Sequence, residues 1–345
     1  MHYLVQAGAA HAELVLRVVA GRWQDADAAV AAGVLLQIMA AMRAHPDSAA
    51  VQEQACRALW YITAGAGAQR DARKQAAADA RALPLVVAAM GAHPASAAVQ
   101  EQACWALCCI TGGAGAQGDA CTQAAADAGA LPLVVAAMGA HPASAAVQEQ
   151  ACRALCNITY GAGAQAAADA GALPLVVTAM GAHPGSAAVQ EQACRAMCNI
   201  TNGAGAQRDA RAQAAADAGA LPLVVAAMGA HPASAAVQEQ ACTALCNITN
   251  GAGAQGDARP QAAADEGALP SVVAAMVAHP ASAAVQEQAC TALCNITGGA
   301  DAQCDARKQA AVAEGALPQI VAATGAHPAN AGVQQWGQYA LGHLQ

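Results

Sequence analysis

Cysteines spaced four residues apart are the most frequent candidates for chemistry in this sequence. Ten of the fourteen form Cys-x₃-Cys pairs, at 104/108, 152/156, 194/198, 242/246 and 290/294. On one helix such a pair has nearly parallel Cα–Cβ bonds, which suit a disulfide poorly. A structural zinc site needs four converging ligands, usually from a Cys-x₂-Cys pair, and that spacing is absent. We therefore interpret these cysteines as small apolar packing residues, with no metal site and no cofactor.

Histidines, glycines and an asparagine suggest three further chemistries. Seven of the ten histidines precede a proline, once per repeat, so they should lie about 10 Å apart and cap or pack a corner instead of sharing a metal ion. The Gly-x-Gly-x-x-Gly at 113–118 follows no strand, which argues against a dinucleotide site. Asn157-Ile-Thr is a glycosylation sequon by pattern, but it falls within an expected packed helix. Because every candidate recurs in each repeat, no single catalytic pocket is expected, and we predict that the chain is not an enzyme.

Charge and hydropathy exclude other partners. The net charge is −8, from 15 Lys and Arg against 23 Asp and Glu, which argues against a nucleic-acid partner. No uninterrupted apolar run reaches the roughly 20 residues that span a bilayer. The first residues, MHYLVQAGAAHAELVLRVVAGR, contain no basic segment before their apolar stretch, so a secretory signal is not expected. We expect a cytoplasmic protein, with the nucleus as the alternative.

The elements that position these residues are repeats. The His-Pro dipeptides begin at 45, 93, 141, 183, 231, 279 and 327, so the successive intervals are 48, 48, 42, 48, 48 and 48. The short interval arises because GAGAQAAADAG at 161–171 lacks six residues of GAGAQRDARAQAAADAG at 203–219. This loss should fall in a loop or at a helix end.

Each repeat divides into three expected helices. The segment 209–219 opens on Asp209, a good N-cap, and closes on Gly219. The segment 221–231 carries Pro222 in its first turn and ends where His231-Pro232 forces a break. The longest helix should follow Ser234, a second N-cap, and run to Asn250. Three such helices cannot bury a core alone, so the repeats must stack.

The third helix carries a family resemblance. VQEQACWALCCITGG at 99–113, followed by a short helix and GALPLVVAAM, resembles the armadillo repeat. The resemblance implies an all-α fold, a right-handed α-solenoid of stacked three-helix repeats at the period of 48 that the His-Pro dipeptides give. Over 1–345 we expect a single solenoid: a capping helix or partial repeat at 1–22, six repeats at 23–304 with 165–201 shortened by six residues, and a C-terminal repeat at 305–345. A two-helix array of the HEAT type is the alternative, if 209–219 forms no helix.

A helical projection of 147–158 separates packing residues from outward ones. Val147 and Leu155 fall on one arc, whereas Gln150, Arg153 and Asn157 fall on the opposite arc. The resemblance implies that this outward arc lines a concave groove, where the family's tryptophan and asparagine hold a partner peptide. The candidate partner-binding residues are therefore the glutamines, the asparagines and the tryptophan or arginine at the tryptophan position of these helices. They are Gln102, Trp105, Gln150, Arg153, Asn157, Gln192, Arg195, Asn199, Gln240, Asn247, Gln288 and Asn295.

These positions predict a non-catalytic scaffold that binds an extended or helical segment of a protein or peptide partner. The alternative is a structural, self-associating or regulatory array within a larger multidomain protein. We expect a monomer. Arginine stands at 57, 153 and 195, where the family has tryptophan, which argues against the basic cargo of nuclear-import adaptors. Replacing Asn157, Asn199, Asn247 and Asn295 with alanine is expected to weaken binding and leave folding intact.

Overall fold

The computed structural model describes residues 33–64, 68–112, 116–159, 163–251, 254–299 and 302–345, with residues 9 and 12 of the N-terminal segment. Apart from those two residues, the predicted capping element at 1–22 lies outside the described part. Every regular element in these ranges is a helix. The all-α prediction is therefore confirmed.

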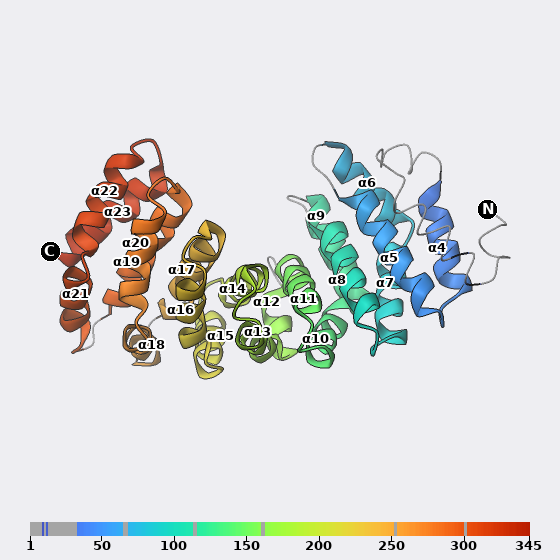
Figure 1. The fold of residues 1–345 in the computed structure, drawn as a ribbon, viewed down its shortest axis with the longest axis horizontal. Helices are drawn as coiled ribbons and strands as arrows, with labels where there is room; N and C mark the ends of the chain where they lie inside the picture. The colour runs from blue at the N-terminus through green and yellow to red at the C-terminus, as the bar shows by residue number, and fades with distance from the viewer. Residues whose placement is uncertain are drawn as a thin grey trace. The chain divides into compact units, whose positions relative to one another are not determined.

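The chain divides into two compact units, residues 1–163 and 164–345 (Figure 1). In the first unit the helices are α4 (Val34–Ala44), α5 (Ala49–Thr63), α6 (Ala68–Asp79), α7 (Ala82–Ala92), α8 (Ala97–Thr111), α9 (Ala116–Asp127), α10 (Ala130–Ala140) and α11 (Ala145–Ile158). The second unit begins with α12 (Ala164–Asp169), α13 (Ala172–Ala182), α14 (Ala187–Thr201), α15 (Ala206–Asp217), α16 (Ala220–Ala230) and α17 (Ala235–Thr249). It ends with α18 (Ala254–Asp265), α19 (Ala268–Ala278), α20 (Ala283–Thr297), α21 (Cys304–Ala313), α22 (Ala316–Ala326) and α23 (Ala331–Leu344).

Each repeat contains a first, a second and a third helix, as α15, α16 and α17 show. Because α15 is a helix of its own, the two-helix alternative is wrong. Asp209 is not its N-cap: α15 begins three residues earlier, after Gly205, and Asp209 lies in its first turn, where a carboxylate favours the helix dipole. The N-cap predicted for the third helix is confirmed, because the Ser234 hydroxyl accepts a hydrogen bond from the Val237 amide at 3.3 Å.

Local chemistry ends the helices at the predicted places. Gly219, between α15 and α16, has a φ of 82°, a left-handed conformation that a side chain disfavours. The second helix ends before His231, which precedes a proline and has a φ of −127° and a ψ of 53°. In the shortened repeat, α12 has 6 residues where α15 has 12. The lost residues therefore belong to the first helix.

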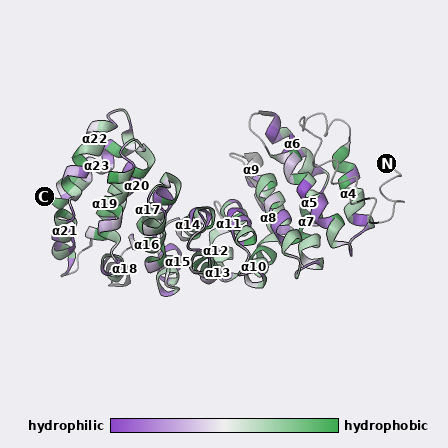
Figure 2. Ribbon diagram, in the orientation of Figure 1, coloured by the Kyte–Doolittle hydropathy of each residue, from purple (hydrophilic) through white to green (hydrophobic). Residues whose placement is uncertain are grey.

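The core of each unit consists of small and aliphatic side chains. Val237, Ala241, Leu245 and Ile248 of α17 are fully buried, and the equivalent positions of α5, α8, α11, α14 and α20 are buried as well. Apolar residues run along the helices of both units (Figure 2). Adjacent third helices pack on one another, α5 on α8 and α8 on α11 in the first unit, and α14, α17, α20 and α23 in succession in the second. This succession is the stacking that the repeat pattern predicts.

The histidines of the His-Pro dipeptides connect successive repeats. The Nε2 atom of His231 lies 2.8 Å from the carbonyl oxygen of Pro184, 47 residues earlier. Because a carbonyl oxygen only accepts, Nε2 must carry the proton. The same bond joins His93 to Pro46, His141 to Pro94, His279 to Pro232 and His327 to Pro280. The predicted corner role of these histidines is confirmed.

A buried glutamine caps the second helix of each repeat. The Nε2 group of Gln238 donates to the carbonyls of Met228, at 2.9 Å, and His231, at 3.0 Å. The Met228 carbonyl is one of the last four of α16, which have no partner within the helix. Equivalent pairs of bonds are made by Gln52, Gln100, Gln148, Gln190, Gln286 and Gln334.

We expect Gln238→Met to lower the free energy of unfolding by about 1–3 kcal/mol, because a side chain of similar size leaves the buried Met228 carbonyl without a donor, whereas the His231 carbonyl keeps its bond from the Ser234 amide. Urea unfolding followed by circular dichroism measures this change. The matched control is Gln240→Met, two residues along the same helix, whose side chain is half-buried and donates to Glu239 at 3.2 Å. If the two variants lost the same free energy of unfolding, the bonds of Gln238 to the end of α16 would stabilise the protein no more than the side chain of Gln240 does.

Buried arginines from the first helices bind the ends of the preceding third helices. Arg259 of α18 is 2% exposed. Its Nε atom donates to the Ile248 carbonyl at 2.6 Å, and its Nη2 atom to the Asn250 carbonyl at 3.3 Å. Arg73, Arg211 and Arg307 make the same contacts at the ends of α5, α14 and α20. Cys121 replaces the arginine in α9, and the deletion removes it from α12.

No single helix of the described ranges is long and apolar enough to span a membrane. Two bent helix pairs meet the length and composition requirement together, Gly118–Asp127 with Ala130–Ala140 and Ala206–Asp217 with Ala220–Ala230.

Candidate partner-binding surface

The predicted binding residues lie on the third helices, and we call the face that carries them the third-helix surface. It is formed by α5, α8 and α11 in the first unit and by α14, α17, α20 and α23 in the second. Because neighbouring third helices pack side by side, equivalent positions of successive repeats within a unit form rows. The structure thus brings the predicted residues of each unit onto one surface, with one set per repeat.

The asparagines of this surface bond to the preceding repeat. The Nδ2 group of Asn157 donates to the Cys108 carbonyl at 2.9 Å, that of Asn247 to the Cys198 carbonyl at 3.0 Å, and that of Asn295 to the Cys246 carbonyl at 3.1 Å. Within the described residues no donor reaches the Oδ1 atom of these three side chains. All three are half-buried, as is Asn199. In Asn157, Asn247 and Asn295 the amide nitrogen therefore joins the repeats, and the Oδ1 atom is left to accept a hydrogen bond.

The glutamines lie deeper than the projection predicts. Gln102, Gln150 and Gln192 are at most 5% exposed, so the prediction that they face outward is wrong for them, while Gln240 and Gln288 are half-buried. The Nε2 groups of Gln102 and Gln150 each donate to the carboxylate one residue before them, at 2.9 and 3.0 Å. These glutamines orient a row of glutamates and add little to the accessible surface.

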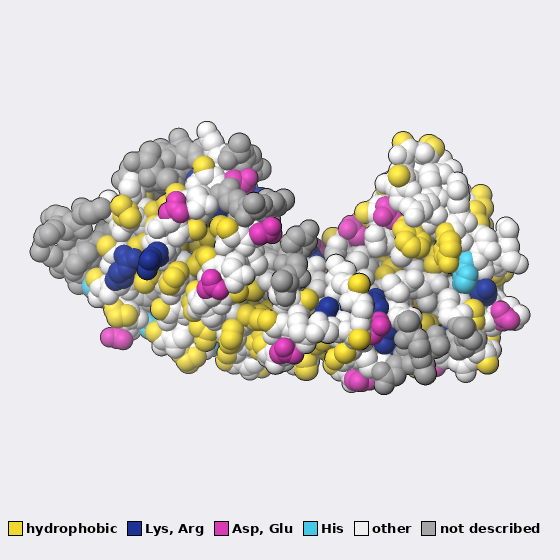
Figure 3. Space-filling model, turned by 180° about the vertical axis from the view of Figure 1, so that it is seen from behind, with side chains coloured by type: hydrophobic (Ala, Val, Ile, Leu, Met, Phe, Trp, Pro, Cys, Tyr) yellow, Lys and Arg dark blue, Asp and Glu magenta, His cyan; other side chains and the backbone are white. Residues whose placement is uncertain are grey.

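The glutamates form an acidic row on the same surface. Burial, together with the nearby carboxylates of Glu53 and Glu149, raises the pKa of Glu101, and Arg57 opposes this shift. Burial also raises the pKa of Glu239, and the charges of Glu191 and Glu287 add to the effect. On the face shown in Figure 3 the acidic side chains are scattered and form no broad patch.

The arginines at the tryptophan position are engaged within their own helices. Arg153 forms an ion pair with Glu149 at 3.0 Å, and Arg57 pairs with Glu53 at 2.9 Å. Both pairs join residues four apart on an exposed helix face, where an ion pair contributes only a few tenths of a kcal/mol. Arg195 is exposed. These arginines therefore remain available to exchange a local carboxylate for one on a partner.

Aromatic side chains gather on the third-helix surface of the first unit. Trp105 stacks on Trp60 with ring centroids 4.0 Å apart and an interplanar angle of 3°, and Tyr61 also stacks on Trp60, with ring centroids 3.8 Å apart. The Trp60 indole N–H donates to Oε1 of the Gln102 side chain at 3.0 Å. Tyr61 is 45% exposed. Trp60 was not among the predicted residues, because its position holds cysteine in the next five repeats, and only the stacking between α5 and α8 reveals the group.

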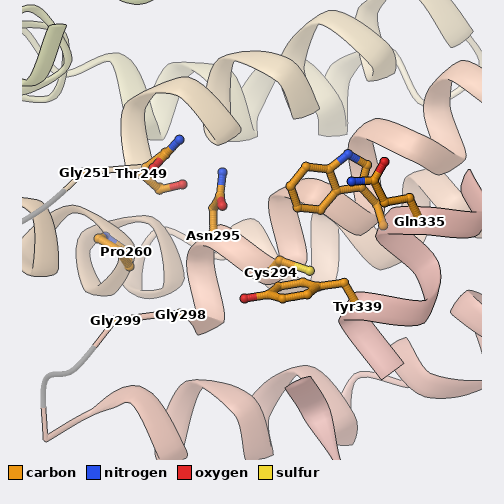
Figure 4. Close-up of a pocket in the computed structure, with 11 residues that line it drawn as sticks. Thr249, Gly251, Pro260, Cys294, Asn295, Gly298, Gly299, Gln335 and Tyr339 are labelled. Atoms are coloured by element: carbon orange, nitrogen blue, oxygen red, sulfur yellow. The ribbon is translucent and has the colours of Figure 1, made fainter. Parts of the chain in front are cut away.

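A hollow of about 540 Å³ opens on the third-helix surface of the second unit (Figure 4). Its lining comes from the end of α17, from Pro260 of α18, from α20 and the backbone after it, and from α23. Asn295 of α20 and Gln335 and Tyr339 of α23 face the hollow, beside Cys294. Trp336 completes this wall and meets Tyr339 edge to face, with ring centroids 6.0 Å apart. Of the predicted site residues, Asn295 alone lines this hollow.

The described cysteines are all free thiols, and most are buried. Burial raises the pKa of the Cys242 thiol to about 12 and that of Cys194 to about 12. A protonated, inaccessible thiol is a poor nucleophile and a poor metal ligand. Within the described ranges no three His, Cys, Asp or Glu side chains gather in a way that would hold a metal ion. The buried cysteines of the third helices therefore act as packing residues.

Comparison with known proteins agrees with this architecture. Residues 118–160 and 209–250 match the family model of the armadillo/β-catenin-like repeat. The chain contains armadillo repeats. Each matched segment of this armadillo chain contains a first, a second and a third helix as described above. A search of curated protein sequences gave no match.

Two solved structures resemble this armadillo chain. The crystal structure of an engineered protein is 26% identical and has a TM-score of 0.61, with 76% of this chain and 96% of that chain covered. The other is a chain from a structure concerning a phosphorylation switch that controls the interaction between cadherin and β-catenin. It is 13% identical with a TM-score of 0.74, and the match covers 94% of this chain and 55% of that chain. This second likeness shows the armadillo solenoid fold alone.

Proposed function

We propose that this protein is a non-catalytic scaffold whose third-helix surface binds an extended or helical segment of a protein partner. The observation that carries the proposal is the arrangement of Asn157 in the first unit and of Asn247 and Asn295 in the second, whose Nδ2 groups are held by the preceding repeat. Fixed amide acceptors in successive repeats, such as Asn247 and Asn295, suit the regularly spaced N–H groups of an extended backbone.

Other features of the surface support a partner site. Trp60, Tyr61 and Trp105 form an accessible aromatic group in a chain without phenylalanine, and buried aromatic anchors dominate most protein interfaces. The armadillo repeat itself suggests a protein-binding role. The proposal includes a monomeric scaffold, so that the surface is free for a different protein.

Replacing Asn157, Asn199, Asn247 and Asn295 with alanine tests the proposal. Peptides of twelve residues are first selected on the wild-type protein from a random display library, and their dissociation constants are then measured for both proteins. We expect at least a tenfold loss of affinity, because each removed hydrogen bond contributes about 0.5–1.5 kcal/mol. Three of these amides also bond between repeats, so we further expect a lower melting temperature, which circular dichroism measures.

The control variant replaces Gln75 and Gln123 with alanine. These glutamines lie on the first helices and donate to Asp79 and Asp127 at 2.7 Å. Their replacement therefore removes amide groups that lie away from the third-helix surface. Unchanged affinity in the asparagine variant, measured below its melting temperature, would rule out this binding surface. Concentration-dependent dimers in light scattering, with no peptide selected, would instead favour a self-associating array.

A further inference from the structure

Lys74 of α6 is a buried lysine without a hydrogen-bond partner. The residue is 3% exposed, and no acceptor among the described residues reaches its Nζ atom. By contrast, the neighbouring Arg73 donates to two carbonyls at the end of α5. Burial lowers the pKa of the Lys74 amine, the charge of Arg70 lowers it further, and Asp71 opposes both effects. Lys74 therefore releases its proton more readily than an ordinary lysine, and the neutral amine has a free lone pair.

The packing of α6 on α8 places this amine beside Cys109. The Nη2 group of Arg70 donates to the carbonyl of Gly112, at the end of α8, at 3.3 Å. Lys74 follows Arg70 by four residues, so it lies one turn further along the same face of α6. Cys109 lies one turn before the end of α8. The two side chains therefore meet in the next layer of the same helix contact.

Equivalent residues of a later repeat support this placement. Pro260 and Asn295 hold the positions of Lys74 and Cys109 in the repeat of α18, α19 and α20, and both line one hollow (Figure 4). Three further repeats pair other residues at these positions: Thr122 with Asn157, Ala212 with Asn247 and Lys308 with His343. Among the described repeats, only the one of α6, α7 and α8 brings an amine and a thiol together here.

The Cys109 thiol lies among cations. It is half-buried, whereas most cysteines of the third helices are fully buried. Burial raises the pKa of Cys109, but the charge of Lys74 opposes this shift most strongly, followed by Arg70, Arg153 and a hydrogen bond from Trp105. These neighbours favour the thiolate, which is the form that peroxide oxidises. Cys109 is thus open to a small oxidant and lies next to a nucleophilic amine.

We infer that Lys74 and Cys109 form a reversible covalent cross-link when hydrogen peroxide oxidises the protein. Peroxide first oxidises the Cys109 sulfur to a sulfenic acid and is itself reduced to water. The Lys74 amine then attacks this sulfur: an S–N bond forms, the S–O bond breaks, and the hydroxyl group leaves with one amine proton as a second water.

The product is a sulfenamide that joins α6 to α8. Two molecules of a small thiol reverse the cross-link, because they restore the amine and the Cys109 thiol and leave as their own disulfide. The inference does not depend on the proposed scaffold function.

Mass spectrometry of the intact chain after oxidation tests the cross-link. The reduced protein is treated with hydrogen peroxide, its remaining thiols are blocked, and its proteolytic peptides are analysed. We expect a peptide pair joined between Lys74 and Cys109, lighter by two hydrogen atoms than the separate peptides, which dithiothreitol separates. A disulfide from Cys109 to Cys108 or Cys121, a cross-link that retains an oxygen atom, or no cross-link would overturn the inference.

The variant Lys74→Met removes the amine and keeps the size of the side chain. Because the Nζ atom makes no hydrogen bond among the described residues, we expect the variant to fold, as circular dichroism verifies. Its sulfenic acid should persist, so dimedone, which traps sulfenic acids, should label Cys109 at least fivefold more than in the wild type. Equal labelling would contradict the attack by Lys74.

The matched control is Lys308→Met, which changes the lysine at the equivalent position of the last repeat. We expect it to form the Lys74–Cys109 cross-link with the yield of the wild type, and an equal loss in both variants would overturn the assignment. If Lys74→Met unfolds, competition in the wild type decides. Dimedone added with the peroxide should lower the yield at least fivefold, because it competes with Lys74 for one sulfenic acid, and an unchanged yield contradicts the condensation.

Discussion

The free energy of unfolding should fall by several kcal/mol between pH 8 and pH 10, as the buried cysteines titrate in the unfolded chain. Burial raises the pKa of five thiols from 9.0 to about 12, those of Cys56, Cys194, Cys242, Cys290 and Cys294. Between these values the unfolded state loses protons that the folded state keeps. Stability from a raised pKa is therefore complete below pH 9 and is lost as the pH rises towards 12.

The loss of stability from these thiols is large compared with the net stability of a folded domain. At pH 10 each such thiol costs about 1 kcal/mol, so five together approach the net stability of an ordinary domain, about 5–15 kcal/mol. Urea unfolding under reducing conditions, at pH 8 and at pH 10, measures the loss. Tyrosines and lysines also titrate in this range, so the wild-type curve alone does not identify the cause.

The variant Cys242→Ala with Cys290→Ala supplies that identification. Its stability at pH 8 changes through packing, but the further loss between pH 8 and pH 10 should be smaller than in the wild type by about 2 kcal/mol, because two titrating groups are gone. Parallel pH dependences in the two proteins would contradict the assignment. Both thiols lie fully buried between third helices of the second unit.

Arg259→Ala should lower the free energy of unfolding by about 3–5 kcal/mol. The guanidinium is 2% exposed and donates to Ile248 and Asn250, and to the Gln213 side chain of the preceding first helix at 3.3 Å. Its removal leaves buried acceptors without a donor and opens a cavity, and each effect is costly. Arg208 also donates to the Asn250 carbonyl, so the loss falls chiefly on Ile248 and Gln213.

Two further variants separate charge, geometry and burial in this effect. Arg259→Lys keeps the charge but lacks the planar fork that reaches several acceptors, so we expect an intermediate loss. Arg195→Ala removes an exposed arginine from α14 and should change stability by less than about 0.5 kcal/mol. A loss below about 1 kcal/mol for Arg259→Ala in urea unfolding would show that the arginine is not essential at the helix end.

The candidate site was only partly predictable from sequence. Placing Asn157, Asn247 and Asn295 on the third-helix surface needed no more than helical periodicity and the family resemblance. Their bonds to the preceding repeat were not predictable, because the acceptors lie 49 residues earlier in the chain. The burial of Gln150 was not predictable either, because it depends on the packing of neighbouring helices. A projection of one helix shows which side a residue takes, but it does not show how closely the next helix approaches.

Sequence alone determined the local structure of this protein. Serine N-caps, left-handed glycines and His-Pro breaks act within a few residues of the chain. They therefore fix the helix ends independently of the tertiary structure. Tertiary structure decided the roles of the polar side chains. The sequence pattern does not distinguish Gln238, Arg259 and His231 from solvated surface residues. In the structure each of them bonds to a backbone carbonyl of another segment. The physical reason is that a buried carbonyl at a helix end requires a donor, and only the stacking of helices determines which side chain reaches it.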